Sequence, residues 1–102
     1  MNYRQKQKME EIVLRYFVFK NQFNVMAFSS GDYDYSHPYY QYYRDVELAI
    51  NRLNSEEKLI ISNDFFVNSP SKWWKEVYTK EDYVRYKAKA ITNFLRYFDE
   101  NH

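Results

Sequence analysis

The chain has 102 residues, a net charge of +1, no cysteine, one glycine and two prolines. The absence of cysteine excludes disulfides, a thiol nucleophile and cysteine-ligated zinc, and suits a reducing cytoplasm. So little glycine and proline leaves few hairpin turns, which disfavours an all-β fold and favours one all-α domain of helices joined by short polar links.

The N-terminal segment, MNYRQKQKMEE, alternates charged and amide side chains, and no apolar run in the chain is long enough to span a membrane. We therefore expect a soluble, cytoplasmic protein without a signal peptide and without membrane contact. Residues 21–70 are acidic overall, whereas both ends of the chain are basic. This distribution suggests one side that faces a polyanion, and an ordinary solvated helix face explains it equally well.

The first predicted helix is long and covers about residues 3–28. Apolar residues recur there at three- and four-residue spacing from residue 9 onward. Phe17, Val18 and Val25 lie off this stripe, so the helix is apolar on more than one side. Such a helix is either central to the domain or shared with a partner, and a homodimer through it is one possibility.

Ser29-Ser30-Gly31-Asp32 ends this helix, and a cluster of tyrosines follows between Tyr33 and Tyr43. Such rings can stack on single-stranded nucleic acid. Acidic residues surround the cluster, however, and no lysine or arginine occurs in it before Arg44. Because a groove that follows the backbone of a nucleic acid needs positive charge, packing explains the cluster better.

The middle of the chain predicts two further helices. Pro38 suits the first turn of a second helix over residues 39–53. Asn54-Ser55 then caps a third helix over residues 56–66, whose first residues are two glutamates that favour the start of a helix. The N-terminal helical pair is thus expected to occupy residues 1–54.

No site for chemistry is visible in the sequence. His37 lies beside a proline in a loop and His102 is the last residue, so neither has the spacing of a metal ligand pair. There is no glycine-rich phosphate loop, and the acidic pairs lie near helix starts, where a structural role is sufficient. We expect no enzyme activity, no cofactor and no metal site.

The C-terminal part, residues 55–98, has the layout of a helix-turn-helix. KWWKEVY predicts a short fourth helix, and Thr79 caps a fifth helix over residues 80–98. We therefore expect about five helices, with residues 1–102 forming one domain. The stripe that should hold the last helix to the core contains Tyr83, Tyr86, Ala90, Ile91 and Phe94.

Residues 79–95, TKEDYVRYKAKAITNFL, resemble the recognition helix in region 4 of bacterial sigma factors without a gap. Thr79 occupies the place of the family's capping serine or threonine, and Glu81 that of its base-reading acid. Residues 53–65, LNSEEKLIISNDF, are similar to its preceding helix. The sequence departs from the family at Val84, where an arginine is usual, and at Asp82, where a basic residue is usual.

The same half of the chain also resembles phage late-gene regulators descended from that module, and small uncharacterised proteins of mollicutes. The resemblance to region 4 implies binding of duplex DNA and transcriptional regulation, with RNA polymerase as a possible partner. The alternative is a protein-interaction module without DNA binding, in which the long first helix and the aromatic surface dock a partner. RNA or single-stranded nucleic acid is a third candidate ligand.

Exposure on the last helix and the resemblance together suggest two sets of DNA contacts. The residues expected at base edges are Lys80, Glu81 and Arg85. Those expected near phosphates are Lys72, Lys75, Lys87 and Lys89.

Overall fold

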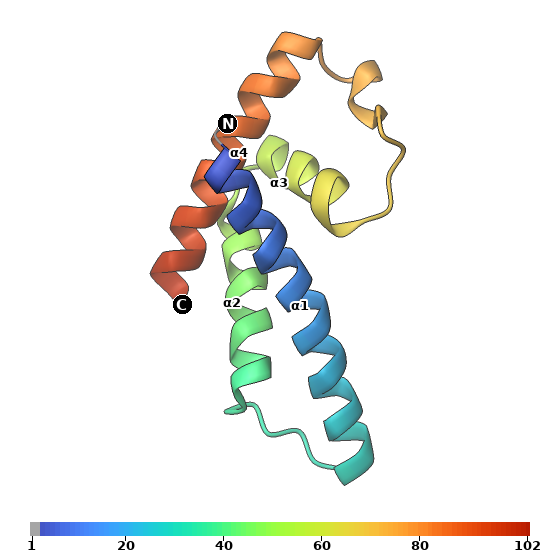
Figure 1. Ribbon diagram of the computed structural model, residues 1–102, viewed down its shortest axis with the longest axis vertical. Coiled ribbons are helices and arrows are strands. Elements are labelled where there is room, and N and C mark those ends of the chain that lie inside the picture. Colours follow the sequence, from blue (N-terminus) through green and yellow to red (C-terminus); the bar gives the residue numbers. More distant parts are fainter. Residues whose placement is uncertain (1–2) are drawn as a thin grey trace.

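The computed structural model describes residues 3–102, and no strand occurs among them. The all-helical fold class expected from the sequence is therefore confirmed. Four α-helices make up most of this part of the chain (Figure 1): α1 Tyr3–Ser30, α2 Pro38–Arg52, α3 Ser55–Ile61 and α4 Lys80–Asn101. Two short elements complete the fold, a π turn at Ser62–Phe66 and a 3₁₀ turn at Trp73–Glu76.

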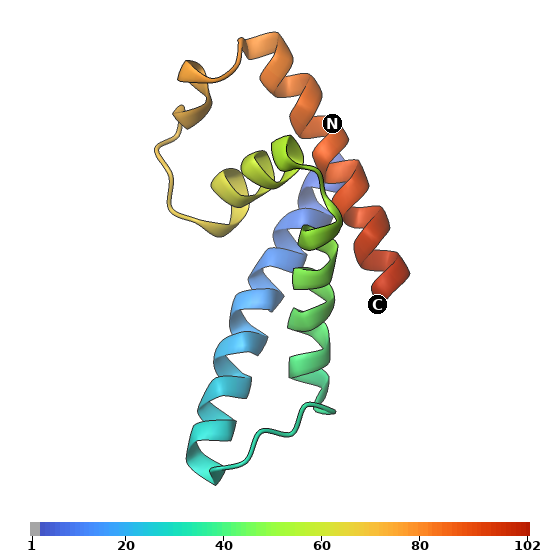
Figure 2. The same ribbon diagram turned by 180° about the vertical axis from the view of Figure 1, so that it is seen from behind.

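Helices α1 and α2 form a long antiparallel hairpin (Figures 1 and 2). Gly31 ends α1 with a φ of 71°, in the left-handed region that glycine adopts without steric cost. His37 then caps α2, because its Nδ1 accepts a hydrogen bond from the Tyr39 N–H at 3.1 Å. Pro38 occupies the first turn, where its missing N–H costs nothing.

Helix α3 begins with a capping box at Asn54. The Asn54 side chain accepts from the Glu57 N–H at 2.8 Å, and the Glu57 side chain accepts from the Asn54 N–H at 3.0 Å. The second carboxylate oxygen of the buried Glu57 accepts from Asn93 of α4. The cap that starts α3 therefore also ties it to α4.

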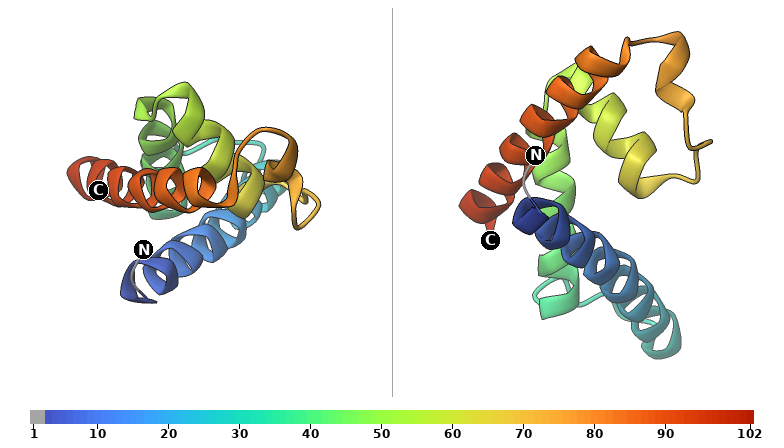
Figure 3. Two further views of the ribbon diagram at one scale, coloured as in Figure 1. Left: turned by 90° about the horizontal axis from the view of Figure 1, so that it is seen from above. Right: turned by 45° about the horizontal axis from the view of Figure 1, so that its top comes forward.

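Helix α4 lies beside the N-terminal end of α1, where Gln5 Nε2 donates to Thr92 Oγ1 at 3.3 Å (Figure 3). One hydrophobic core joins all four helices, so the two predicted parts, residues 1–54 and 55–98, pack around the same centre. The core residues with no exposed surface are Met9, Val46, Ala49, Ile60, Ile61, Ala90, Ile91 and Phe94.

The segment predicted as the fourth helix differs from expectation. KWWKEVY contains only the 3₁₀ turn Trp73–Glu76, and residues 67–79 connect the π turn to α4 as an extended arch (Figures 1 and 2). A helix this short has little stability of its own, so contacts of the two tryptophan rings decide its backbone. Within residues 3–102 the predicted count of about five helices and the predicted helix-turn-helix are therefore not confirmed. A 3₁₀ turn precedes α4 in place of an α-helix joined to it by a tight turn.

Candidate nucleic-acid interface

The residues predicted to contact DNA lie at one end of the molecule, opposite the loop that joins α1 to α2 (Figure 1). Most of them lie on α4 and two on the 3₁₀ turn or next to it. The exposed ones are Lys72, Lys75, Lys80, Glu81, Arg85 and Lys89, whereas Lys87 is half-buried.

Helix α4 starts where the sequence predicts, at Lys80. The Thr79 hydroxyl caps it by accepting from the Asp82 N–H at 3.1 Å. The inner side of the helix buries Ala90, Ile91 and Phe94, as expected from their spacing. The opposite side is therefore free to meet a ligand.

A basic row runs along that outward side. Arg85, Lys89 and Arg96 are all exposed, and their spacing of four and seven residues places them on one side of a helix. Residues 83–98 contain no aspartate or glutamate. The row is therefore positive along most of α4, which suits a polyanion.

Near the start of α4, Lys80, Glu81, Val84 and Arg85 line a shallow depression of about 470 Å³. The Arg85 guanidinium pairs with Asp82 at 2.9 Å, and the Arg85 side chain is 68% exposed. An exposed pair of this kind contributes about 1 kcal/mol or less, so it opens easily for another partner.

Sequence reasoning missed Val84 as a contact residue. Its side chain is 53% exposed and shares the depression with Lys80 and Arg85. An apolar side chain at this place can contact the methyl group of thymine in a major groove. The spacing gave no signal for this, since Val84 lies seven residues before the buried Ile91 and so on the same side of the helix.

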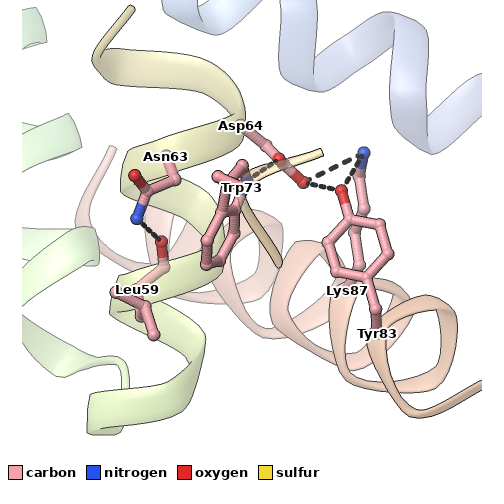
Figure 4. A network of polar contacts seen from close by, with 6 residues as sticks. All are labelled: Leu59, Asn63, Asp64, Trp73, Tyr83 and Lys87. Carbon is pink, nitrogen blue, oxygen red and sulfur yellow. Dashed lines mark hydrogen bonds and ion pairs between the residues drawn. The ribbon is translucent and has the colours of Figure 1, made fainter. Parts of the chain in front are cut away.

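Lys87, predicted to lie near phosphates, is paired inside the molecule. Its Nζ pairs with the Asp64 carboxylate at 3.1 Å, and the Lys87 side chain is 21% exposed (Figure 4). The same ammonium lies over the rings of Phe65 and Tyr83, each 5.5 Å from the centroid. Lys87 therefore belongs to the internal packing between the π turn and α4.

Asp64 is the centre of this internal network, which Figure 4 shows. Its carboxylate accepts from Trp73 Nε1 at 2.8 Å and from the Tyr83 hydroxyl. Burial, and then the hydrogen bond and negative charge of Asp64, raise the pKa of Tyr83 well above its usual value. The hydroxyl thus stays protonated and remains a donor. The ring of Trp74 stacks on Tyr83 with centroids 4.6 Å apart.

The network fixes the arch of residues 67–79 against α4. Trp73 and Trp74 are anchored inward, and Lys72 and Lys75 beside them remain exposed. The basic residues of the arch are therefore held close to the start of α4 by contacts that involve none of their own charged groups.

The tyrosine cluster packs within the hairpin of α1 and α2. The rings of Tyr33, Tyr35, Tyr40 and Tyr43 all contact the buried Phe23, with centroids 5.3 to 6.2 Å apart. This arrangement supports the packing interpretation of the cluster over a stacking platform for single strands.

Comparison with family models, with curated proteins and with solved structures found no match to this chain. Within residues 3–102, no group of three or more histidine, aspartate or glutamate side chains is placed to hold a metal ion. No helix in that range has the length and apolar character needed to cross a bilayer. The function has to be inferred from the geometry of the residues themselves.

Proposed function

We propose that this chain binds duplex DNA through the outward side of α4 and acts as a transcriptional regulator. The observation that carries the proposal is the depression that Lys80, Val84 and Arg85 line at the capped start of α4. It adjoins the exposed basic row of Arg85, Lys89 and Arg96 on the outward side of the same helix. An α-helix fits the major groove, where arginine and lysine recognise guanine and apolar groups contact thymine.

The roles of the residues follow from their exposure. Arg85 and Lys80 would reach base edges together with Glu81 and Val84, whereas Lys89 would meet phosphates. Lys72 and Lys75 of the arch would add phosphate contacts from outside α4. In this proposal Lys87 supports the interface and does not touch the ligand.

Further support comes from the resemblance of residues 79–95 to sigma region 4. The cap at Thr79 and the inner stripe of α4 occur at the positions which that resemblance implies. In such a scheme RNA polymerase is a natural partner, and the short 3₁₀ turn replaces the first helix of the usual unit. The proposal therefore concerns a variant helix-turn-helix protein.

The test begins with selection of preferred sequences from a random duplex library by the unmodified protein. Arg85→Ala should then cost about 1–3 kcal/mol on the selected site and little on random duplex, because it removes a base-edge donor. Lys75→Ala and Lys89→Ala should weaken all sequences alike and each reduce the salt slope by about one unit.

Arg44→Ala is the matched control, since Arg44 is an exposed arginine paired with an aspartate on α2, towards the other end of the molecule. It removes the same charge and should leave DNA binding nearly unchanged. If no duplex is preferred over random DNA, or if Arg85→Ala and Arg44→Ala behave alike, the proposal fails.

A second variant tests the proposal by a gain of binding. Asp82→Asn removes the carboxylate that pairs with Arg85 at 2.9 Å and takes one negative charge away from the interface. Binding to duplex DNA should become several-fold tighter at low salt, with a salt slope steeper by about one unit. Unchanged or weaker binding by this variant would place the DNA elsewhere.

A protein-interaction role without DNA binding is the second candidate function. The observation that favours it is the apolar outer side of α1, on which several large side chains are exposed. If the DNA experiments fail, this surface becomes the main functional feature of the molecule.

A further inference from the structure

Helix α1 exposes a second apolar stripe, opposite the one that it buries. The buried side contains Ile12, Tyr16 and Phe23, and at 100° per residue the outer stripe lies about half a turn away from it. The members of the outer stripe are 45 to 87% exposed: Leu14, Phe17, Val18, Val25 and Phe28.

The second half of α1 also lacks charge. Residues 21–31 contain no lysine, arginine, aspartate or glutamate, although only α2 and its connecting loop lie beside them (Figures 1 and 2). The outer side of a solvated helix is normally polar and charged. An apolar stripe on an uncharged helix is instead typical of the centre of a protein interface.

Four of the five members of the stripe are placed symmetrically about Asn21, the exception being Val18. Leu14 and Phe28 lie seven residues before and after it, and Phe17 and Val25 lie four before and after it. In a two-fold interface, if a residue of one copy contacts a second residue in the partner, then that second residue also contacts the first residue of the partner. In an antiparallel pair with the axis at Asn21, this palindromic spacing makes apolar residues of one copy meet apolar residues of the other.

We propose that two copies of this chain associate through α1, antiparallel, with the two-fold axis at Asn21. Leu14 then meets the partner's Phe28, and Phe17 meets the partner's Val25. Asn21 faces its own counterpart, and a single polar pair in an apolar helix interface sets the register.

Charge favours the antiparallel orientation over the parallel one. Residues 3–11 of α1 carry three basic and two acidic side chains, a net charge of +1, whereas the loop after α1 carries Asp32 and Asp34 and no lysine or arginine, a net charge of −2. Antiparallel helices bring the basic end of each copy towards the acidic loop of the other. A parallel pair would bring like charges together.

The structure also offers a place for the most exposed member of the stripe. Phe28 is 87% exposed, and its counterpart in this register is Leu14. Leu14 borders a groove of about 430 Å³ in which apolar side chains, among them Phe17 and Phe65, alternate with the charged Lys6, Glu10, Asp64 and Lys87. A phenylalanine seated in such a groove is the usual kind of anchor in an interface.

Sedimentation and light scattering over a concentration series test the association. The unmodified chain should show twice its mass of 12.7 kDa, and Phe28→Glu should show the mass of a monomer with an unchanged circular dichroism spectrum. Leu48→Glu is the control, since Leu48 is an exposed apolar residue of α2 outside the stripe, and it should remain a dimer.

Disulfide trapping tests the register, because the chain has no cysteine of its own. Asn21→Cys should cross-link copies in mild oxidant, since the two positions meet at the axis. Leu14→Cys alone should not, because the antiparallel register separates its two copies by about 21 Å, beyond the reach of a disulfide. A mixture of Leu14→Cys and Phe28→Cys chains should cross-link.

The proposed register would be overturned if Leu14→Cys chains cross-linked to each other and Asn21→Cys chains did not. A monomeric unmodified chain at all soluble concentrations would overturn the dimer. If that monomer instead bound phosphatidylcholine vesicles and Phe28→Glu did not, the stripe would face lipid, and the proposal would again be wrong.

Discussion

Replacing Asp64 by alanine removes the acceptor that three side chains share. Its carboxylate accepts hydrogen bonds from the Trp73 indole and the Tyr83 hydroxyl, and it pairs with the Lys87 ammonium at 3.1 Å. These contacts join the π turn, the arch of residues 67–79 and α4. The variant therefore tests whether the network holds the supposed DNA-binding end of the molecule together.

The expected loss in the free energy of unfolding follows from the burial of these groups. A buried donor without a partner costs about 1–3 kcal/mol, and breaking a buried ion pair costs about 3–5 kcal/mol. The Lys87 side chain is 21% exposed and lies within 3.4 Å of the Tyr83 hydroxyl, so water and this contact recover part of the loss. We expect a net loss of about 2–4 kcal/mol, which lowers Tm by about 10–30 °C in a domain of this size.

Urea unfolding followed by far-ultraviolet circular dichroism and tryptophan fluorescence measures the loss. Asp99→Ala is the control, because Asp99 pairs with Lys8 at 3.4 Å in a bridge that is about half exposed on both sides, where a pair contributes at most about 1 kcal/mol. If Asp64→Ala costs no more than Asp99→Ala, the network does not stabilise the fold and the reasoning is refuted.

Three further variants test single contacts. Burial and Asp64 raise the pKa of Tyr83, so above about pH 10 the folded protein keeps a proton that the unfolded chain loses. The free energy of unfolding therefore falls as the pH rises above about 10. Tyr83→Phe should make this fall smaller in thermal melts at alkaline pH. Asn54→Ala removes the capping box of α3 and should cost about 0.5–2 kcal/mol in urea titrations, and a negligible loss would argue against the cap. His102→Ala takes away the ring nitrogen 3.2 Å from the buried Asp45 carboxylate. Because the ring is half exposed, we expect the free energy of unfolding to fall by about 1 kcal/mol. An unchanged free energy of unfolding would contradict this.

Local signals explain why most helix boundaries were predictable. Pro38, Asn54 and Thr79 each mark the start of a helix in the structure, because a cap acts within a few residues of itself. The end of α1 was predicted at Phe28 and occurs two residues later, just before Gly31. The all-helical class follows from the same kind of local information, together with the shortage of turn residues.

The structure of residues 72–78 could not be read from the sequence. Their helical spacing predicts an α-helix, but the indole of Trp73 bonds Asp64, nine residues earlier, and Trp74 stacks on Tyr83, nine residues later. Such contacts depend on where α3 and α4 lie in space. A segment too short to stabilise itself takes the backbone that these contacts require.

Lys87 and Lys89 show what sequence and tertiary structure each decide about the candidate site. The sequence alone places both lysines on one helix without acidic neighbours, and it also reveals that α1 is apolar on two sides. Only the packing of the π turn against α4 brings Asp64 to Lys87 and leaves Lys89 in solvent. In the same way, α2 covers one side of α1 and leaves Phe28 exposed. Periodicity assigns a residue to a side of its helix, but the neighbouring helices decide which side is buried, because burial depends on contacts between residues distant in the chain.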